Sequence, residues 1–280
     1  MTRTVLITGC SSGFGKATAK RFAETGWNVV ATMRNVTSAG DLNGQPNILV
    51  TRLDVQDPTS VVSAVKQAID RFGHVDALIN NAGFGLHGIF ETIPPEKIQE
   101  QFEVNVFGAM TVTRVLLPHF RARRAGIIVN VSSGAGVFTL PLISLYCASK
   151  FALEGFSEAL TYEVAPLGIT VKIVEPGGSL STNFGSRSRT EGMSSTVPSD
   201  YLPIAEDAGA RFQGLAQVAT ATAEEVADVI YTATTDGTDQ LRYVATRDIE
   251  PFVRARRETS ETTYIKTMRD AFMARPTERT

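Results

Sequence analysis

Short runs of apolar and β-branched residues alternate with segments of helical periodicity along most of this chain, and this alternation constrains the fold more than any other feature. The strand-like runs are apolar at consecutive positions, as in NVVATM at 28–33. Strands that are apolar on both faces are covered by helices on both sides, and helices between them make neighbouring strands parallel. The pattern predicts an α/β fold, a doubly wound parallel sheet in a three-layer sandwich of the Rossmann type. We expect strands at 4–8, 28–33, 48–53, 77–79, 126–131, 169–175 and 241–245, and helices that include 59–72, 96–120, 146–165 and 223–234.

The chain of 280 residues has the length of one large α/β domain, and we expect a single domain over 1–280. The stretch 177–221 breaks the alternation, because it is long and rich in Ser, Thr, Gly and Pro. Connections of that length are often lids or binding loops, so a substrate lid is predicted there; a permanently packed segment is the alternative. From about residue 250 onward the chain is highly charged, and a helical tail that packs on the domain or on a partner is expected.

Composition and charge exclude several classes of protein. Lys and Arg total 27 against 29 Asp and Glu, which argues against nucleic acid as a partner. No apolar run is long enough to span a membrane, and the N-terminal MTRTVLITG lacks the long apolar region of a signal peptide. The only cysteines, Cys10 and Cys147, are too few for a disulfide framework, so we expect a cytoplasmic protein. The three histidines have no metal-ligand neighbours, and no metal site is predicted.

A glycine-rich turn, TGCSSGFG at 8–15, joins the first strand to the first helix. A dinucleotide needs a tight turn, close approach of the backbone to its pyrophosphate, and a helix N-terminus directed at the phosphates. Glycines that only make a turn are the alternative. In the main interpretation, the residues of this turn that bind the cofactor are Gly9, Ser11, Ser12, Gly13, Phe14 and Gly15.

The end of the second strand bears on which dinucleotide is bound. An acidic residue there would bind the adenosine 2′-hydroxyl, whereas an arginine accepts a 2′-phosphate. The chain reads ATMRN at 31–35, with Arg34 and no acid, which favours NADP(H) over NAD(H). Asp54, after the third strand, is expected to bond to adenine, and Asn81, Ala82 and Gly83, after the fourth, to lie beside the ribose.

Tyr146 and Lys150 are four residues apart at the start of a predicted helix and share a face, and Ser133 ends the preceding strand. Reduction of a carbonyl needs a proton donor for the oxygen. A lysine ammonium stabilises a phenolate and lowers the pKa of a tyrosine, and a serine hydroxyl can hold the substrate oxygen. We therefore expect Ser133 and Tyr146 to bind substrate, with Tyr146 as the acid/base. A half-buried tyrosine beside a surface lysine is the alternative.

Asn105 lies on the apolar stripe of the predicted helix at 96–120. A buried amide costs about 1–3 kcal/mol unless it is hydrogen-bonded. Two interpretations stay open: a structural amide that anchors backbone, and an amide that binds a water in a proton relay behind Lys150.

Taken together, these motifs resemble the short-chain dehydrogenase/reductase family, over roughly residues 4–182, and most closely its 17β-hydroxysteroid/retinol dehydrogenase-like branch. The resemblance rests on TGCSSGFG, Asp54-Val55, NNAG at 80–83, Asn105, Ser133, YCASK at 146–150 and Pro176-Gly177. It implies that Asn105, Ser133, Tyr146 and Lys150 form a catalytic tetrad, and that Lys150 also binds the nicotinamide ribose. It further implies cofactor contacts from Val55, Tyr146, Pro176, Gly177 and a residue that is Thr182 or Ser181, with Thr182 preferred, and a homodimer or homotetramer formed through the helices at 96–120 and 146–165.

The sequence thus predicts an oxidoreductase that transfers a hydride between a nicotinamide dinucleotide, NADP(H) by preference, and an apolar ketone or secondary alcohol. An NAD-dependent alcohol dehydrogenase is the alternative within this class. A non-catalytic dinucleotide sensor is disfavoured because a sensor needs no proton donor. A dehalogenase- or lyase-type relative without a dinucleotide is disfavoured by the glycine turn and Lys150.

Overall fold

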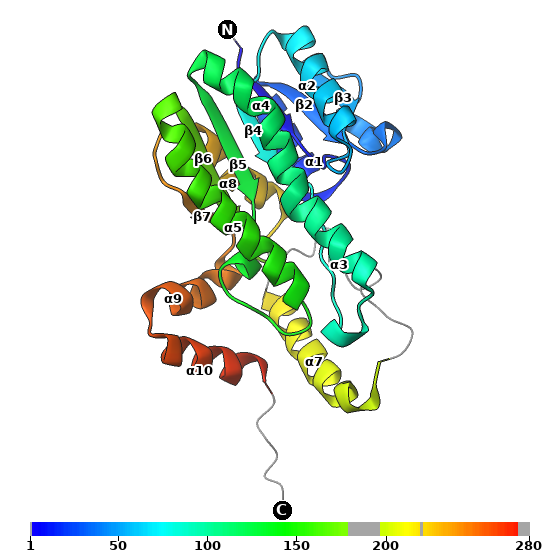
Figure 1. Cartoon of the computed structure of the whole chain (residues 1–280), viewed down its shortest axis with the longest axis vertical. Coiled ribbons are helices and arrows are strands. Elements are labelled where there is room, and N and C mark those ends of the chain that lie inside the picture. The colour runs from blue at the N-terminus through cyan, green and yellow to red at the C-terminus, as the bar shows by residue number, and fades with distance from the viewer. Residues whose placement is uncertain (1, 179–196, 219–220, 274–280) are drawn as a thin grey trace, which may run out of the picture.

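The structure is a computed structural model that describes residues 2–178, 197–218 and 221–273. Its centre is a seven-stranded parallel sheet with the strand order β3-β2-β1-β4-β5-β6-β7 (Figure 1). The order reverses between β1 and β4, which confirms the predicted doubly wound α/β fold. The strands are β1 Thr4–Ile7, β2 Asn28–Met33, β3 Ile48–Arg52, β4 Ala77–Asn80, β5 Gly126–Val131, β6 Ile169–Glu175 and β7 Arg242–Val244.

Helices cover both faces of the sheet, as strands apolar on both sides require. On one face α1 (Gly13–Glu24) and α8 (Ala223–Thr235) enclose a core with β1 and β2. On the other face α2 (Pro58–Phe72), α4 (Ala109–Arg123) and α5 (Ser144–Val164) enclose a second core. The predicted start of α2 is confirmed: the Asp57 carboxylate accepts hydrogen bonds from the backbone N–H groups of Thr59 and Ser60.

The long helix predicted at 96–120 is divided into three parts. They are α3 (Pro95–Phe102), a π-helical segment (Glu103–Gly108) and α4. Asn105 lies in the π-helical segment, where its side chain bonds to the Phe84 backbone. Gly108, the last residue of the segment, packs closely against Val55, since a Cβ at Gly108 would lie 2.7 Å from Val55 Cβ. Helical periodicity in a sequence does not reveal such a one-residue widening.

The second half of the predicted lid is helical, which corrects the expectation of an irregular loop there. A 3₁₀ turn (Ser199–Tyr201) leads into α7 (Leu202–Val218), whose two glycines weaken the helical signal in the sequence. Residues 179–196 and 219–220 lie outside the described residues, so closure of the lid stays a prediction.

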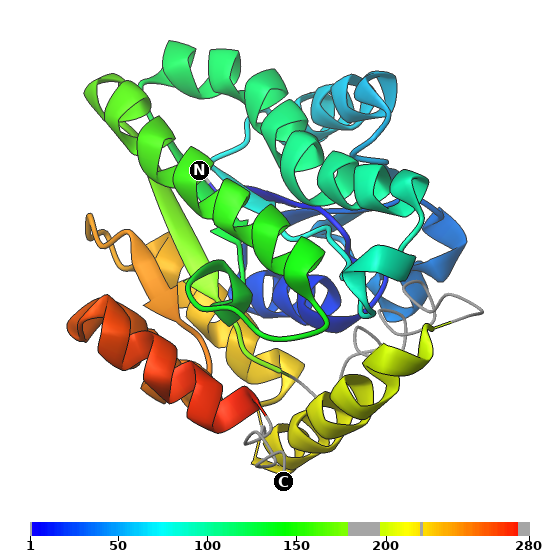
Figure 2. The same ribbon diagram turned by 60° about the horizontal axis from the view of Figure 1, so that its bottom comes forward.

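The C-terminal tail forms two helices that pack on the domain; packing on a partner stays a prediction. These helices, α9 (Glu250–Glu258) and α10 (Glu261–Phe272), share an apolar cluster with Val137 and Phe138 in the loop after β5. Figure 2 shows α10 and α7 on two sides of the same end of the molecule, with the loop between β5 and α5 between them.

Candidate active site

The predicted site residues converge at the carboxyl end of the parallel strands, where ligands bind in doubly wound sheets. The turn after β1, the loop after β4, the start of α5 after β5, and the Pro176-Gly177 segment after β6 all lie at this edge. The sheet therefore places the glycine turn beside the Ser133, Tyr146 and Lys150 group.

The glycine turn is shaped to bring its backbone close to a ligand. Gly9 has φ 76° and Gly13 has φ 55°, a region that side chains disfavour. A Cβ at Gly15 would lie 2.3 Å from the Gly9 carbonyl oxygen and 2.4 Å from Asn81 Nδ2. Ser12 is the N-cap of α1, but its side chain does not cap the helix. The first N–H groups of α1 thus lack a side-chain acceptor from the N-cap, which suits a phosphate.

The loop after β4 is hydrogen-bonded to this turn through Thr8, a residue that the sequence reasoning did not single out. Thr8 Oγ1 accepts from the backbone N–H groups of Asn81 (3.0 Å) and Ala82 (2.9 Å). In return, Asn81 Nδ2 donates to the Thr8 carbonyl at 2.9 Å. Asn81 and Ala82 are therefore held at the turn by defined contacts, as the ribose-side prediction requires.

At the expected adenosine end, Arg34 is exposed, and among the described residues no ion pair or hydrogen bond of its side chain is found. Met33, where an acidic residue is missing, is 2% exposed and packs in the core. Asp54 is half-buried and accepts a hydrogen bond from Gln56 N at 3.1 Å. Among the described residues, no group pairs with the Arg34 guanidinium at the end of β2.

Ser133 and Tyr146 are brought together by the loop after β5 and the first turn of α5. Ser133 Oγ accepts from Ala135 N at 3.1 Å and donates weakly to the Pro176 carbonyl at 3.4 Å. Tyr146 is 9% exposed, and its hydroxyl is hydrogen-bonded with Ser133. Burial raises the pKa of Tyr146 above its ordinary range, and the bond with Ser133 opposes this only in part.

Lys150 lies one turn further along α5 and is 5% exposed. Its Nζ donates to the Val131 carbonyl at 2.8 Å and lies 5.7 Å from the centroid of the Tyr146 ring. Burial lowers the pKa of Lys150 to about 8, and the nearby Glu154 carboxylate opposes that shift. Burial is the largest influence on the pKa of Tyr146, and the lowering of that pKa by Lys150 stays a prediction.

Asn105 is fully engaged by protein groups. Its Oδ1 accepts from Phe84 N (3.0 Å), and its Nδ2 donates to the Phe84 carbonyl (2.8 Å) and to Ser149 Oγ (3.0 Å). A Cβ at Gly83 would lie 3.1 Å from Asn105 Oδ1 and 3.8 Å from Lys150 Nζ. The geometry favours the interpretation of Asn105 as a backbone anchor; a water relay stays a prediction.

The segment after β6 is held by residues from beyond β7. Gly177 N donates to Thr246 Oγ1 at 2.8 Å, and Gly178 N donates to Asp248 Oδ2 at 3.3 Å. Sequence reasoning missed Thr246 and Asp248, because nothing local marks a contact across about seventy residues. Thr182, expected at the nicotinamide, and Ser181, its alternative, lie outside the described residues.

Two further properties concern only the described part of the chain. No group of three or more His, Cys, Asp or Glu side chains there is arranged to hold a metal ion. Likewise, no helix of those residues combines the length and the apolar character that crossing a bilayer requires.

Curated proteins similar to this chain are oxidoreductases. The family model described as short chain dehydrogenase matches residues 3–192. An uncharacterised oxidoreductase of Schizosaccharomyces pombe is 37% identical over 238 residues, 85% of this chain and 98% of that protein. A 3-ketodihydrosphingosine reductase of Bacteroides thetaiotaomicron is 44% identical over 173 residues, 62% of each chain. Retinol dehydrogenase 8 of Bos taurus is 40% identical over 185 residues, 62% of this chain and 58% of that protein.

Solved structures share the whole fold. A short-chain dehydrogenase from Streptomyces avermitilis superposes with a TM-score of 0.79 at 32% identity, covering 96% of this chain and 94% of the other. A 3-ketoacyl-(acyl-carrier-protein) reductase from Brucella melitensis, complexed with NADH, has a TM-score of 0.73 at 27% identity, with 87% and 96% covered. ElxO with NADP bound has a TM-score of 0.72 at 25% identity, with 88% and 98% covered. Structures similar to this chain thus bind either nicotinamide dinucleotide.

Proposed function

The chain belongs to the short-chain dehydrogenase family and is a nicotinamide-dinucleotide-dependent oxidoreductase, and from this premise we propose that it reduces apolar ketones with NADPH. The observation that carries the proposal is the arrangement of Ser133, Tyr146 and Lys150. A buried tyrosine with a raised pKa is protonated at neutral pH, which is the state that a proton donor needs.

The dinucleotide, when bound, supplies the hydride that reaches the carbonyl carbon of the substrate. Tyr146 gives its phenolic proton to the carbonyl oxygen, so that a ketone becomes a secondary alcohol. Ser133 Oγ donates to the same oxygen and stabilises its developing negative charge. The Lys150 ammonium stabilises the Tyr146 phenolate that remains. Lys150 is also the residue that would hold the nicotinamide ribose.

Phosphate contacts are assigned to the turn at residues 9–15, which is packed so tightly that a Cβ on Gly15 would overlap the Gly9 carbonyl oxygen. Arg34 is assigned to the 2′-phosphate, because its exposed guanidinium has no other partner among the described residues and can bind a phosphate through two N–H groups. NADPH is preferred over NADH on this ground. Asp54, Val55 and the residues 81–83 keep their assignment to adenine and ribose.

An apolar substrate is favoured by the side chains near the reacting centre. Phe84, Leu86, Ile93 and Leu145 form a buried apolar cluster between the loop after β4 and the start of α5. The names of two relatives, a 3-ketodihydrosphingosine reductase and a retinol dehydrogenase, also refer to compounds with long apolar chains. Ketones with an extended hydrocarbon part are therefore the substrates to test first.

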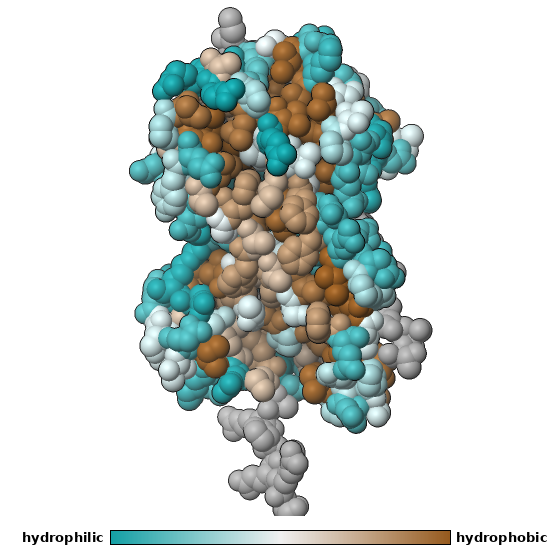
Figure 3. All heavy atoms as spheres, viewed as in Figure 1, coloured by the Kyte–Doolittle hydropathy of each residue, from teal (hydrophilic) through white to brown (hydrophobic). Residues whose placement is uncertain are grey.

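A homodimer or homotetramer through α4 and the helix α5 is part of the proposal. Figure 3 shows brown and tan atoms along the middle of the face that these helices present in Figure 1, with teal at the sides. Phe107 is 51% exposed beside α4, and Phe151 is 38% exposed on α5. Large exposed apolar side chains of this kind are typical of surfaces that associate.

The test compares Tyr146→Phe with Tyr162→Phe, the same change on a 73% exposed tyrosine of the same helix. Tyr146→Phe removes only the proton-donating hydroxyl, so kcat for ketone reduction should fall about 100-fold or more while the Kd of NADPH stays within about twofold. Tyr162→Phe should leave both unchanged. A Tyr146→Phe protein with near-normal kcat refutes the mechanism, and a wild-type protein that binds NADPH but turns over no ketone or alcohol is the dinucleotide sensor.

A further inference from the structure

A cluster of charged side chains lies directly behind the reacting centre, and the chemistry proposed above does not use it. Glu154 follows Lys150 by one turn of α5, and Glu175 is the last residue of β6, next to Pro176. The side chains of Glu154 and Glu175 are only 8% and 0% exposed. Two buried carboxylates this close to a catalytic lysine need a physical explanation, because unpaired buried charges are strongly unfavourable.

Two arginines from the C-terminal part of the chain neutralise these carboxylates. Arg242 of β7 donates from Nε to Glu154 Oε2 at 3.0 Å and from Nη2 to Glu158 Oε2 at 2.6 Å. Its Nε also lies 3.6 Å from Glu175 Oε1. Arg257 of α9 donates from Nη2 to the same Glu175 oxygen at 2.5 Å. With Lys150, three cations face three carboxylates.

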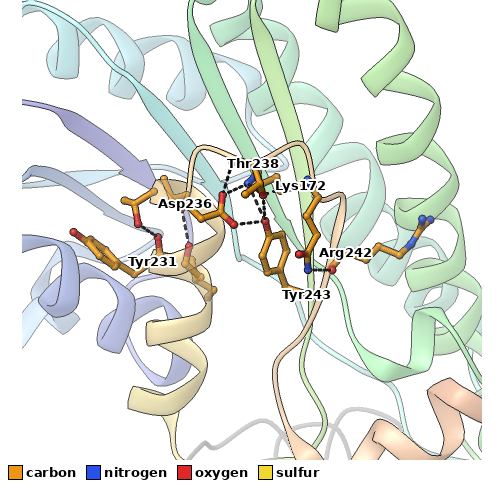
Figure 4. A network of polar contacts seen from close by, with 10 residues as sticks. Lys172, Tyr231, Asp236, Thr238, Arg242 and Tyr243 are labelled. Carbon is orange, nitrogen blue, oxygen red and sulfur yellow. Dashed lines mark hydrogen bonds and ion pairs between the residues drawn. The ribbon is translucent and has the colours of Figure 1, made fainter.

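A second buried lysine, Lys172, belongs to a separate network on the opposite face of the sheet. Lys172 is bonded to Asp236 at 2.5 Å and to the Tyr243 hydroxyl at 2.9 Å. Adjacent residues of a strand point to opposite faces, and Figure 4 shows Arg242 and Tyr243 pointing away from each other on β7. Changes around Arg242 and Arg257 should therefore leave Lys172 undisturbed.

Whether Glu154 is ionised depends on how Arg242 and Arg257 are divided between the Glu154 and Glu175 carboxylates. Burial raises the pKa of Glu154, and the Glu175 carboxylate raises it further, whereas Arg242 lowers it. Because Arg257 pairs with Glu175, Arg242 can pair with Glu154. Without Arg257, two buried carboxylates would compete for Arg242, and the pKa of Glu154 would rise because Arg242 no longer pairs with it alone.

We propose that Arg257 is a positioning residue that occupies the Glu175 carboxylate, leaves Arg242 to Glu154 and so keeps Glu154 ionised, and that ionised Glu154 holds Lys150 in its protonated form. The proposal rests on the proposed function, in which the Lys150 ammonium stabilises the Tyr146 phenolate. A nearby negative charge favours the ammonium, so its loss lowers the pKa of Lys150. That pKa is already lowered to about 8 by burial, so a further decrease makes Lys150 neutral at physiological pH. Helix α9 thereby acts on proton transfer without touching substrate.

The first measurement is the titration of Lys150 by NMR in protein labelled with ¹³C at the lysine Cε. Arg257→Met should lower the pKa of Lys150 by about one unit, because Glu154, one turn further along α5, would lose its charge. The matched control is Arg254→Met on the same helix, whose side chain is 70% exposed. It should leave the titration of Lys150 unchanged.

The second measurement separates a charge effect from a general disturbance of α9. In Glu175→Gln/Arg257→Met, Glu154 keeps Arg242 and loses its competitor, so the pKa of Lys150 should return to the wild-type value. Glu154→Gln leaves α9 intact and should lower that pKa by a similar amount. An unchanged Lys150 titration in both Arg257→Met and Glu154→Gln overturns the proposal, and so does a double variant that stays as low as Arg257→Met.

The pH profile of ketone reduction links the titration to catalysis. Lys150 must be protonated, so kcat/KM should decline above the pKa of Lys150, and this decline should begin about one pH unit lower in Arg257→Met. The double variant should restore the wild-type profile, whereas KM for NADPH at low pH should not change. If the wild-type chain reduces no ketone, the proposed function fails, while the NMR titrations still decide the inference about Lys150.

Discussion

The substitution Gly15→Ala tests the assignment of the glycine turn most directly. The added Cβ would lie 2.3 Å from the Gly9 carbonyl oxygen, 2.4 Å from Asn81 Nδ2 and 2.9 Å from Gly9 C. None of these atoms belongs to a flexible chain end. Asn81 Nδ2 is hydrogen-bonded to the Thr8 carbonyl, and Gly9 holds a positive φ of 76°. The turn must therefore open, and the N-terminus of α1 must move away from β4.

The magnitude follows from this geometry. Extra atoms in a packed site cost about 1–3 kcal/mol, and each kcal/mol lowers the Tm of a domain of similar size by about 2–4 °C, so a decrease of about 2–12 °C is expected. The effect on binding should be larger in relative terms. Loss of one hydrogen bond to a charged phosphate costs about 1.5–3 kcal/mol, which raises the Kd of NADPH roughly 10- to 150-fold.

Two assays check this prediction: fluorescence titration with NADPH, and thermal unfolding with and without the dinucleotide. The control is Gly209→Ala in α7, where a Cβ would meet nothing within 4 Å. That change should stabilise the protein by about 0.5–1 kcal/mol and leave NADPH binding unchanged. A Gly15→Ala protein with a wild-type Kd for NADPH would show that the turn is only a chain reversal and does not bind phosphate.

Two further predictions concern cofactor choice and stability. Arg34→Met should weaken NADPH about tenfold, the effect of losing one exposed charge-assisted contact, and leave NADH unchanged; equal effects in titrations with both dinucleotides contradict the 2′-phosphate assignment. Asp236→Asn leaves Lys172 buried without its counter-ion and should destabilise the fold by about 3 kcal/mol in urea unfolding at pH 7, and Lys172→Met/Asp236→Asn should recover part of this. Lys172 holds the pKa of Asp236 below its ordinary value, so the pair's contribution to the free energy of unfolding is present above about pH 4 and decreases as the pH falls further. The difference in stability between wild type and Asp236→Asn should therefore shrink at about pH 3. A difference that does not depend on pH contradicts the pairing.

Most of the fold and the core of the candidate site could be predicted from local sequence patterns. The run NVVATM at 28–33 is apolar at consecutive positions, and the strand it forms, β2, is paired on both edges and buried on both faces. Asp57 and Pro58 mark the start of α2 with side-chain chemistry that acts within three residues. The spacing of Tyr146 and Lys150 fixes their shared helix face in the same way.

Features that depend on distant partners could not be read from the sequence. Glu175 meets Arg257 across 82 residues, and Gly177 meets Thr246 across 69. No residue near Glu175 in sequence indicates that its carboxylate is paired, although a glutamate at the end of a buried strand is itself a signal that a cation lies opposite. Helix α7 was missed for a different reason, because its two glycines weaken the helical signal and it follows a stretch rich in Ser, Thr, Gly and Pro.

The Asn105 side chain joins segments of the chain that are distant in sequence. Its amide bonds to both backbone groups of Phe84, in the loop after β4, and it also reaches Ser149, the neighbour of Lys150 on α5. To reach them the helix must widen by one residue, which accounts for the π-helical segment. The loop after β4 binds the glycine turn through Thr8, so Asn105 connects the proposed phosphate site to the helix that carries Tyr146 and Lys150. These contacts support the interpretation of Asn105 as a backbone anchor, and removing its amide should displace Gly83 and Lys150 together.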